Sequence, residues 1–322
     1  MKIGIIIPYF GKLPNYFQVF LDSCRVNVDY DWLIFTNDKT SYNYPKNVKC
    51  ISMEFEECKQ LIQSKFDFNI ILKSPQKLCD YKCAYGYIFE EYLKEYSWWG
   101  YCDLDQVFGN LNHFITKEML NKYDKLFSLG HLSMYRNTYE NNRVFMNNIN
   151  GTKRYKEVFT TEHGCAFDEW LPNNINEIYL KTNHPVMLNN MCADINPYRT
   201  QFTVVKYDVD NRKYINATEN NSIFKWENGC VYQIYYDKSE KKKVEFPYIH
   251  LQKRKMKDFR SKTNDSFYII PNRFINTEVN EEGLLKECKI WKLLNYQYIK
   301  VKWNSLKQRV KNRNWKRQNV FK

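Results

Sequence analysis

Short apolar runs alternate with longer amphipathic stretches along the first 130 residues. Residues 2–8 (KIGIIIP), 31–36 (DWLIFT) and 48–53 (VKCISM) are rich in β-branched and other apolar side chains, which predicts buried strands. Apolar positions recur at helical spacing over residues 14–27 and 80–96, which predicts amphipathic helices. Strands that alternate with helices indicate an α/β fold, built on a mainly parallel sheet with helices on both faces.

The rest of the chain is less regular, and its strand signals alternate with turns. Residues from about 280 onward have helical character. Further strands are predicted at residues 98–103, 125–129, 201–207, 230–236, 244–251 and 267–270.

Two aspartates follow the strand predicted at residues 98–103, within the segment WWGYCDLDQVFG. Asp103 and Asp105 are two residues apart, so they leave the strand on the same side. Neighbouring carboxylates repel each other and lose hydration unless a cation joins them. A divalent ion that also holds a diphosphate satisfies both groups, because hard cations bind carboxylate and phosphate oxygens together. The alternative is a solvated turn with two surface aspartates.

Ligands of open α/β sheets bind beyond the carboxyl ends of the strands. Three polar or turn-forming segments follow predicted strands: Pro8–Gly11, Asn37-Asp38 and Asp103–Asp105. We therefore expect these segments to lie at one edge of the sheet.

Composition supports a globular protein, since 43% of the residues are hydrophobic. The 26 Tyr and 8 Trp suit sugar binding, although most aromatic rings are expected to pack in the core. Ten scattered cysteines without a C-x-x-C pair argue against a zinc site. With no expected signal peptide or membrane span, reduced thiols in a cytoplasmic protein are the simplest interpretation.

The positive charge is concentrated near the C-terminus. Residues 286–322 contain twelve Lys/Arg and one Glu, out of a net charge of +13 for the whole chain. We expect a main domain over residues 1–255 and an extension over 256–322. Residues 284–317 mix cations with apolar side chains, which predicts a basic amphipathic helix on an anionic membrane surface. Such a helix would place a cytoplasmic protein at the inner face of the cell membrane. The alternative is a helix docked on the domain with a solvated basic face.

Five ordered motifs resemble those of the GT-A glycosyltransferases, and more narrowly the DUF6625 family of bacterial surface-polysaccharide clusters. The resemblance covers roughly residues 1–255, with the D-x-D motif at its centre. The motifs are IIIPYFG, FTND, KLCDYKCAYGYIFEEYL, WGYCDLDQVFG and FPYIHLQKRKM.

The resemblance implies a binding site for a nucleotide-sugar, with a UDP-sugar as the donor. Several of its residues have structural alternatives: a tight turn at Gly11, a turn or helix cap at Asp38, and a helix cap at Asp80. Lys77 and Lys82 are alternatively solvated surface residues. The implied donor-site residues are Pro8, Tyr9, Phe10, Gly11, Asp38, Lys77, Asp80, Lys82, Asp103, Asp105, His131 and Lys253.

The resemblance also implies a metal site, with Mn²⁺ or Mg²⁺ held by Asp103, Asp105 and a late histidine, His250. Neutral imidazole is an acceptable Mn²⁺ ligand. A histidine between apolar residues, as in Tyr248-Ile249-His250-Leu251, is alternatively a core residue with a hydrogen-bonded ring.

An acidic pair about sixty residues after the D-x-D lies where the fold often places its acceptor-side carboxylate. Asp168 is the first choice for a general base that takes the acceptor hydroxyl proton, and Glu169 is the second. The alternative is a helix start, where acidic side chains are favoured by the helix dipole.

These features predict a metal-dependent glycosyltransferase that moves a sugar to a glycan or lipid-linked glycan in surface polysaccharide synthesis. A nucleotidyltransferase is the nearest alternative, but it would more often have a Gly-rich phosphate loop after the first strand. A nucleic-acid-binding protein is a further alternative, although the cations are concentrated in the tail and no RNA-binding motif is present.

Overall fold

The computed structural model describes residues 1–169, 172–217, 221–238, 240–252, 254–261, 265–288, 294 and 296–319. The chain forms two compact units that are interleaved in sequence. The boundary predicted at residue 255 lies inside the second unit. The first unit comprises residues 1–104, 110–191 and 207–213, and the second comprises 105–109, 192–206 and 214–322.

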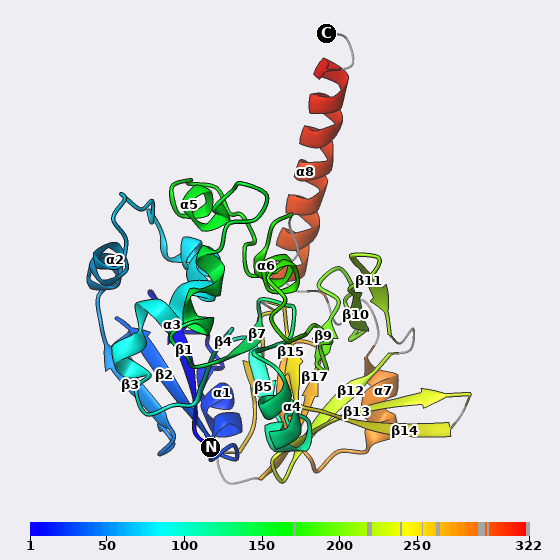
Figure 1. Cartoon of the computed structure of the whole chain (residues 1–322). Helices are drawn as coiled ribbons and strands as arrows, with labels where there is room; N and C mark the ends of the chain where they lie inside the picture. Colours follow the sequence, from blue (N-terminus) through cyan, green and yellow to red (C-terminus); the bar gives the residue numbers. More distant parts are fainter. Residues whose placement is uncertain are drawn as a thin grey trace. The chain divides into compact units, whose positions relative to one another are not determined.

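The first unit is built on a seven-stranded sheet with the order β3-β2-β1-β4-β7-β6-β8 (Figure 1). The strands β1 to β4 are mutually parallel, whereas β7 runs antiparallel to both of its neighbours, β4 and β6. The α/β class is thus confirmed, but the sheets of this chain are mixed and not mainly parallel as predicted. The bounds are β1 Ile3–Pro8, β2 Tyr30–Thr36, β3 Val48–Ser52, β4 Trp98–Cys102, β6 Lys125–Leu126, β7 Leu132–Arg136 and β8 Val186–Met187.

An aromatic core fills the first unit and accounts for many of the chain's Phe, Tyr and Trp residues. Trp99 stacks on Tyr135 with ring centroids 4.4 Å apart, and Tyr81 stacks on Phe159 at 4.1 Å. All seven residues of β2 are buried, as its continuous apolar pattern predicts. The helices and turns of this unit are α1 Phe17–Cys24, α2 Phe55–Ser64, η3 Leu111–His113, α4 Lys117–Lys122, η4 Asn141–Met146, α5 Arg154–Phe159 and α6 Ile175–Lys181.

The single amphipathic helix predicted over residues 80–96 is wrong. The segment instead contains the 3₁₀ turns η1 (Pro75–Ala84) and η2 (Glu90–Tyr92) around one short helix, α3 (Tyr85–Ile88). Three polar residues of η1, Lys77, Asp80 and Lys82, are buried. An amphipathic helix would instead place polar residues on a solvent-exposed face. Asp80 lies within η1 and therefore does not cap the predicted helix.

The second unit contains two sheets with the orders β11-β10-β9-β15-β5 and β14-β13-β12-β17-β18-β16. The strand predicted at residues 244–251 is divided at Pro247, which has no N–H to donate and whose carbonyl oxygen accepts a hydrogen bond from Gly109 N at 2.7 Å. The bounds are β5 Gln106–Phe108, β9 Ala193–Ile195, β10 Val204–Asp208, β11 Lys213–Asn216, β12 Ile223–Glu227, β13 Cys230–Asp237, β14 Glu240–Phe246, β15 Tyr248–His250, β16 Lys257–Asp258, β17 Ser266–Ile270 and β18 Arg273–Asn276.

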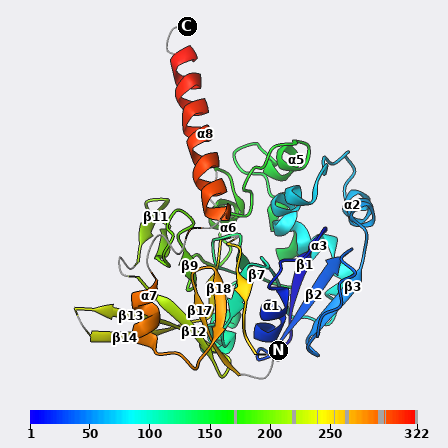
Figure 2. The same ribbon diagram turned by 180° about the vertical axis from the view of Figure 1, so that it is seen from behind.

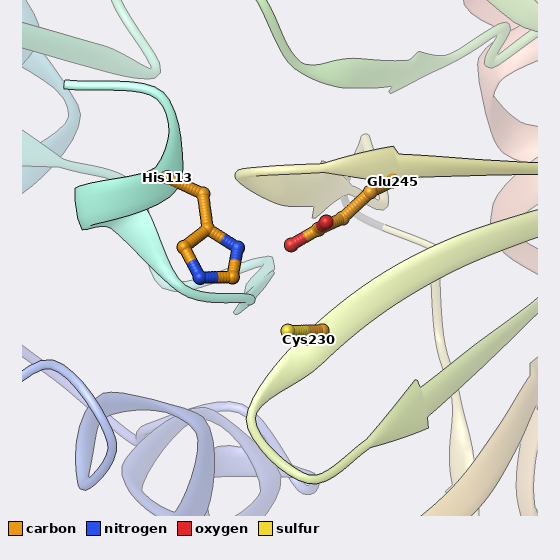
Figure 3. A group of neighbouring side chains, drawn as sticks. All are labelled: His113, Cys230 and Glu245. Atoms are coloured by element: carbon orange, nitrogen blue, oxygen red, sulfur yellow. The ribbon is translucent and has the colours of Figure 1, made fainter.

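The hairpin of β13 and β14 carries Cys230, Tyr232 and Glu245 on one face. Tyr232 is directly opposite Glu245, and Cys230 precedes Tyr232 by two residues on the same side of the strand. Figure 3 shows Cys230 and Glu245 on these strands, and it also labels His113, which ends η3 in the first unit. Burial and the neighbouring Cys230 raise the pKa of Tyr232 to about 12.

The C-terminal segment contains two helices, α7 (Glu281–Glu287) and α8 (Tyr296–Asn319), in place of one predicted helix over residues 284–317. Leu284 and Cys288 pack in a core cluster with Ile223 and Ile234, so α7 is docked on the six-stranded sheet (Figure 2). Residues 289–293 and 295 lie outside the described residues. In the part of the chain that the structure describes, none of the helices combines the length and apolar character that crossing a bilayer requires.

Candidate functional site

A buried lysine holds two acidic side chains together in the first unit. Lys82 Nζ lies 2.7 Å from Asp103 Oδ1 and 3.7 Å from Asp168 Oδ2. The same ammonium donates to the carbonyl oxygen of Gly130 at 2.7 Å. Three of the residues predicted for the site, far apart in the sequence, therefore meet directly.

Backbone contacts determine where these acidic groups lie. Asp103 follows β4, and its N–H donates to the carbonyl oxygen of His131 at 3.0 Å. Gly130 N donates to Glu169 Oε1 at 3.1 Å. A Cβ on Gly130 would come within 2.2 Å of Asp168 Oδ2, so a side chain at this position would displace the carboxylate. His131 is itself buried, in the same turn.

Burial dominates the electrostatics of this cluster. Desolvation raises the pKa of Asp168 to about 7, although Lys82 acts in the opposite direction. Burial lowers the pKa of Lys82, but Asp103 and other acidic neighbours raise it, and the net result is well above its ordinary value. Lys82 is therefore a permanent cation, and Asp168 changes charge near neutral pH.

A second buried ion pair holds the segment that leads to Asp168. Lys77 Nζ lies 2.8 Å from Asp80 Oδ2 and donates to the carbonyl oxygen of His163 at 2.7 Å. The Asp80 carboxylate accepts from Cys165 N at 2.9 Å and from Phe167 N at 3.4 Å. Lys77 and Asp80, predicted as donor-site residues, thus connect η1 to the chain just before Asp168.

Asn176 and Lys125, which were not predicted as site residues, support the segment that contains Asp168 and Glu169. Asn176 Nδ2 donates to the carbonyl oxygens of Glu169 at 2.8 Å and Ser128 at 2.9 Å. Lys125 Nζ donates to Asn176 Oδ1 at 2.7 Å, and burial lowers the pKa of Lys125 to about 7. The apolar pattern of residues 125–129 predicts a strand but does not indicate that Lys125 is buried.

The loop after β1 is attached to the end of β2, at the same sheet edge as Asp103. Gly11, at φ +98°, donates to Asn37 Oδ1 at 2.8 Å, and Leu13 N donates to Asp38 Oδ2 at 2.8 Å. Hydrogen bonds from Thr40 and Leu13 lower the pKa of Asp38. Because β1, β2 and β4 are parallel neighbours, the prediction that their following segments share one edge is confirmed for this unit.

The two aromatic residues of this loop have different environments. Phe10 is buried and packs edge-on against Phe55, with ring centroids 5.5 Å apart. Tyr9 is half-buried, its hydroxyl donates to the carbonyl oxygen of Lys12 at 3.4 Å, and Pro8 before it ends β1. Of these two rings, both among the implied donor-site residues, Phe10 is a core residue and Tyr9 is the more accessible.

The second unit contains a histidine–carboxylate cluster. His250 Nε2 lies 3.3 Å from Asp105 Oδ1, and His250 Nδ1 lies 2.9 Å from Asp194 Oδ1. Gln252 Nε2 donates to the same Asp194 oxygen at 2.6 Å. The strand β15 lies between β9 and β5, and this pairing places His250 between the two carboxylates.

The cluster fits the donor set of a divalent cation. Burial lowers the pKa of His250, but Asp105 and Asp194 raise it well above its ordinary value, so an imidazolium balances the carboxylates. Asp105 oxygen and neutral His250 nitrogen are both suitable Mn²⁺ ligands. Asp194 on Nδ1 would fix the ring so that Nε2 faces the metal, as outer carboxylates do in many metal sites. Asp194 was not predicted, because it is an isolated acidic residue in a short strand.

Asp103 and Asp105 belong to different units, since the division falls between Leu104 and Asp105. Within the first unit Asp103 contacts Lys82, and within the second unit Asp105 contacts His250. Their shared membership of one metal site stays a prediction. Lys253 lies outside the described residues.

We expect Asp194→Asn to weaken Mn²⁺ binding about 10- to 100-fold, because the His250 ring loses the acceptor that orients it. Calorimetric titration of the protein with Mn²⁺ measures this loss. Asp210→Asn makes the same change at an exposed position and should bind as the unchanged protein does. Equal affinities in both variants would contradict the orienting role of Asp194.

The described residues form an α/β protein with mixed sheets, in which acidic side chains pair with the buried Lys82 in one unit and with the buried His250 in the other. The chain belongs to the DUF6625 family, a family of unknown function, which matches residues 5–278. No curated protein matches the sequence.

Proposed function

We propose that this protein is a metal-dependent glycosyltransferase, which moves a sugar from a nucleotide-sugar to a glycan or lipid-linked glycan in bacterial surface polysaccharide synthesis. A UDP-sugar is the proposed donor, and Mn²⁺ or Mg²⁺ is the proposed cofactor. The observation that carries this proposal is the contact of the buried Lys82 with the half-buried Asp103 and the buried Asp168, beyond the carboxyl end of β4.

This location suits a nucleotide-sugar because open α/β sheets bind their ligands at the carboxyl ends of the strands. The loops after β1 and β2 end at the same edge and present Tyr9 and the ionised Asp38. A half-buried aromatic ring can stack on a base, and a carboxylate can accept hydrogen bonds from ribose hydroxyls. Lys77 and Asp80 support the neighbouring segment as a buried pair.

Sugar transfer requires removal of the acceptor hydroxyl proton. In the proposed displacement, the acceptor oxygen attacks the anomeric carbon, the bond to the diphosphate breaks, and the proton passes to the Asp168 carboxylate. A pKa of about 7 gives Asp168 both an ionised population at neutral pH and enough basicity to take the proton. Lys82 holds Asp103 and Asp168 at fixed positions and stabilises their charge.

Asp105 and His250, with Asp103 by prediction, are the residues that would hold the cation. When bound, a divalent cation supplies Lewis-acid stabilisation of the departing diphosphate. With a cation in place of the Nε2 proton, Asp194 would hold the remaining proton on Nδ1 of His250 and so keep Nε2 directed at the cation.

Calorimetric titration with UDP and a panel of nucleotide-sugars, with and without Mn²⁺, tests the proposal. We expect Mn²⁺-dependent nucleotide binding that Asp105→Ala abolishes and the exposed control Asp210→Ala preserves. The donor sugars that bind are then tested for transfer to glycan acceptors. Absence of nucleotide binding in the unchanged protein would overturn the glycosyltransferase proposal.

A further inference from the structure

Helix α8 exposes a continuous apolar stripe. Five large side chains on this helix are more than half exposed: Tyr296 at 68%, Ile299 at 56%, Trp303 at 59%, Leu306 at 58% and Val310 at 54%. Successive members are three or four residues apart, so all five lie along one face of the helix. Because the five side chains are exposed among the described residues, only a further surface could bury this face of α8.

The stripe is bordered by cations. The sequence of α8 contains eight Lys/Arg and no Asp or Glu. At 100° per residue, Lys300 and Lys307 fall beside one edge of the stripe and Lys302 falls beside the other. All three side chains are exposed, and Lys307 Nζ also lies 5.6 Å from the centre of the Trp303 ring.

Two surfaces could cover the apolar stripe, a second copy of α8 or an anionic bilayer, and the cations beside the stripe favour the bilayer. A second copy of α8 could cover the apolar face, but it would bring sixteen like charges together without a single acidic partner on either helix. An anionic bilayer accepts both features, because its acyl boundary takes the apolar side chains and its headgroups attract the cations. Lysines at the edges of the stripe can extend their ammonium groups toward the headgroups.

We propose that α8 is a membrane-surface helix, which lies in the plane of an anionic phospholipid bilayer with the stripe from Tyr296 to Val310 toward the acyl chains. The partner is defined by its chemistry: anionic headgroups above an apolar layer. This inference does not depend on the proposed sugar transfer, since vesicle binding requires neither metal nor nucleotide. A lipid-linked acceptor would be found at the same surface.

Co-sedimentation of the full chain with vesicles tests the inference directly. The vesicles contain neutral phosphatidylcholine alone or with added phosphatidylglycerol, and no metal or nucleotide is present. We expect strong binding only to the anionic vesicles. Replacing Lys300, Lys302 and Lys307 together by Gln should weaken that binding by about 100-fold, at roughly fivefold per cation.

The apolar contribution is tested by Trp303→Ser combined with Leu306→Ser, which we expect to weaken binding at least tenfold. The matched control combines Phe259→Ser with Val279→Ser, two other exposed apolar residues at 60% and 43% exposure, and should bind normally. Circular dichroism verifies that each variant is folded. Equal binding to both vesicle types, no vesicle binding, or self-association that Trp303→Ser and Leu306→Ser abolish would each overturn the inference.

Discussion

Asp168→Asn should lower the rate of sugar transfer about 10²- to 10⁴-fold, because an amide cannot accept the proton of the acceptor hydroxyl. The asparagine side chain has nearly the same size as aspartate, so the packing beside Gly130 is preserved. Initial rates with a donor identified by calorimetry measure the effect, with donor affinity determined in parallel. We expect the affinity to change far less than the rate.

Glu169→Gln is the informative comparison, since Glu169 is the neighbouring acid and its side chain accepts from Gly130 N. The glutamine oxygen can still accept this hydrogen bond, and the rate should fall much less than in Asp168→Asn. In the unchanged protein, the rate should rise with pH through about 7 as Asp168 ionises. A larger loss in Glu169→Gln, with an unchanged pH profile, would assign the base to Glu169.

Asp168→Asn, although it should slow sugar transfer, should not destabilise the folded protein above neutral pH. The folded-state pKa of Asp168 is raised from 3.8 to about 7, so the protonated carboxyl favours folding. That advantage is present at low pH and is lost progressively between about pH 4 and pH 7, by at most ~4 kcal/mol. At about pH 8 the neutral asparagine avoids this loss, and Asp168→Asn should unfold at the same or a higher temperature than the unchanged protein.

Lys82→Met should lower the free energy of unfolding by ~3 kcal/mol, since it leaves two acidic side chains without their cation. We expect the lower end of the range for a broken buried pair because the Asp103 side chain is 35% exposed. The deficit should be larger at about pH 8 than at about pH 5, where Asp168 is protonated in both proteins. Urea unfolding at the two pH values measures it.

Lys59→Met is the matched control for this substitution. Lys59 Nζ also lies 2.7 Å from a carboxylate, that of Glu56, but the two side chains are 40% and 63% exposed. Its loss should change stability by less than about 0.5 kcal/mol, with little dependence on pH. Similar deficits in the two variants would show that Lys82 does not hold a buried pair of charges.

The strands with continuous apolar runs were predictable because burial on both faces leaves little choice of residue. Residues 2–8 and 31–36 correspond closely to β1 and β2. The antiparallel strand β7 was not predicted, because its insertion between β4 and β6 depends on partners far apart in the sequence. The resulting mixed sheet could not be read from local periodicity.

The candidate site was predictable where acidic residues stand in a recognisable local pattern. Asp103 of the D-x-D motif and Asp168, both selected from the sequence, lie beside Lys82 in the structure. Asp194 and Lys125 have no such pattern, and only strand pairing brings Asp194 to His250. The helix predicted over residues 80–96 failed because Lys82 and Asp80 make buried polar contacts, which hydrophobic periodicity does not register.

The central position of β1 has a consequence for synthesis on the ribosome. β1 pairs with β2 on one side and with β4 on the other, and β4 begins only at Trp98. A nascent chain that ends before this strand therefore presents an apolar edge, Ile3–Pro8, with unsatisfied backbone groups. Truncated chains of this kind should aggregate or recruit chaperones, whereas chains that extend past β8 can complete the sheet.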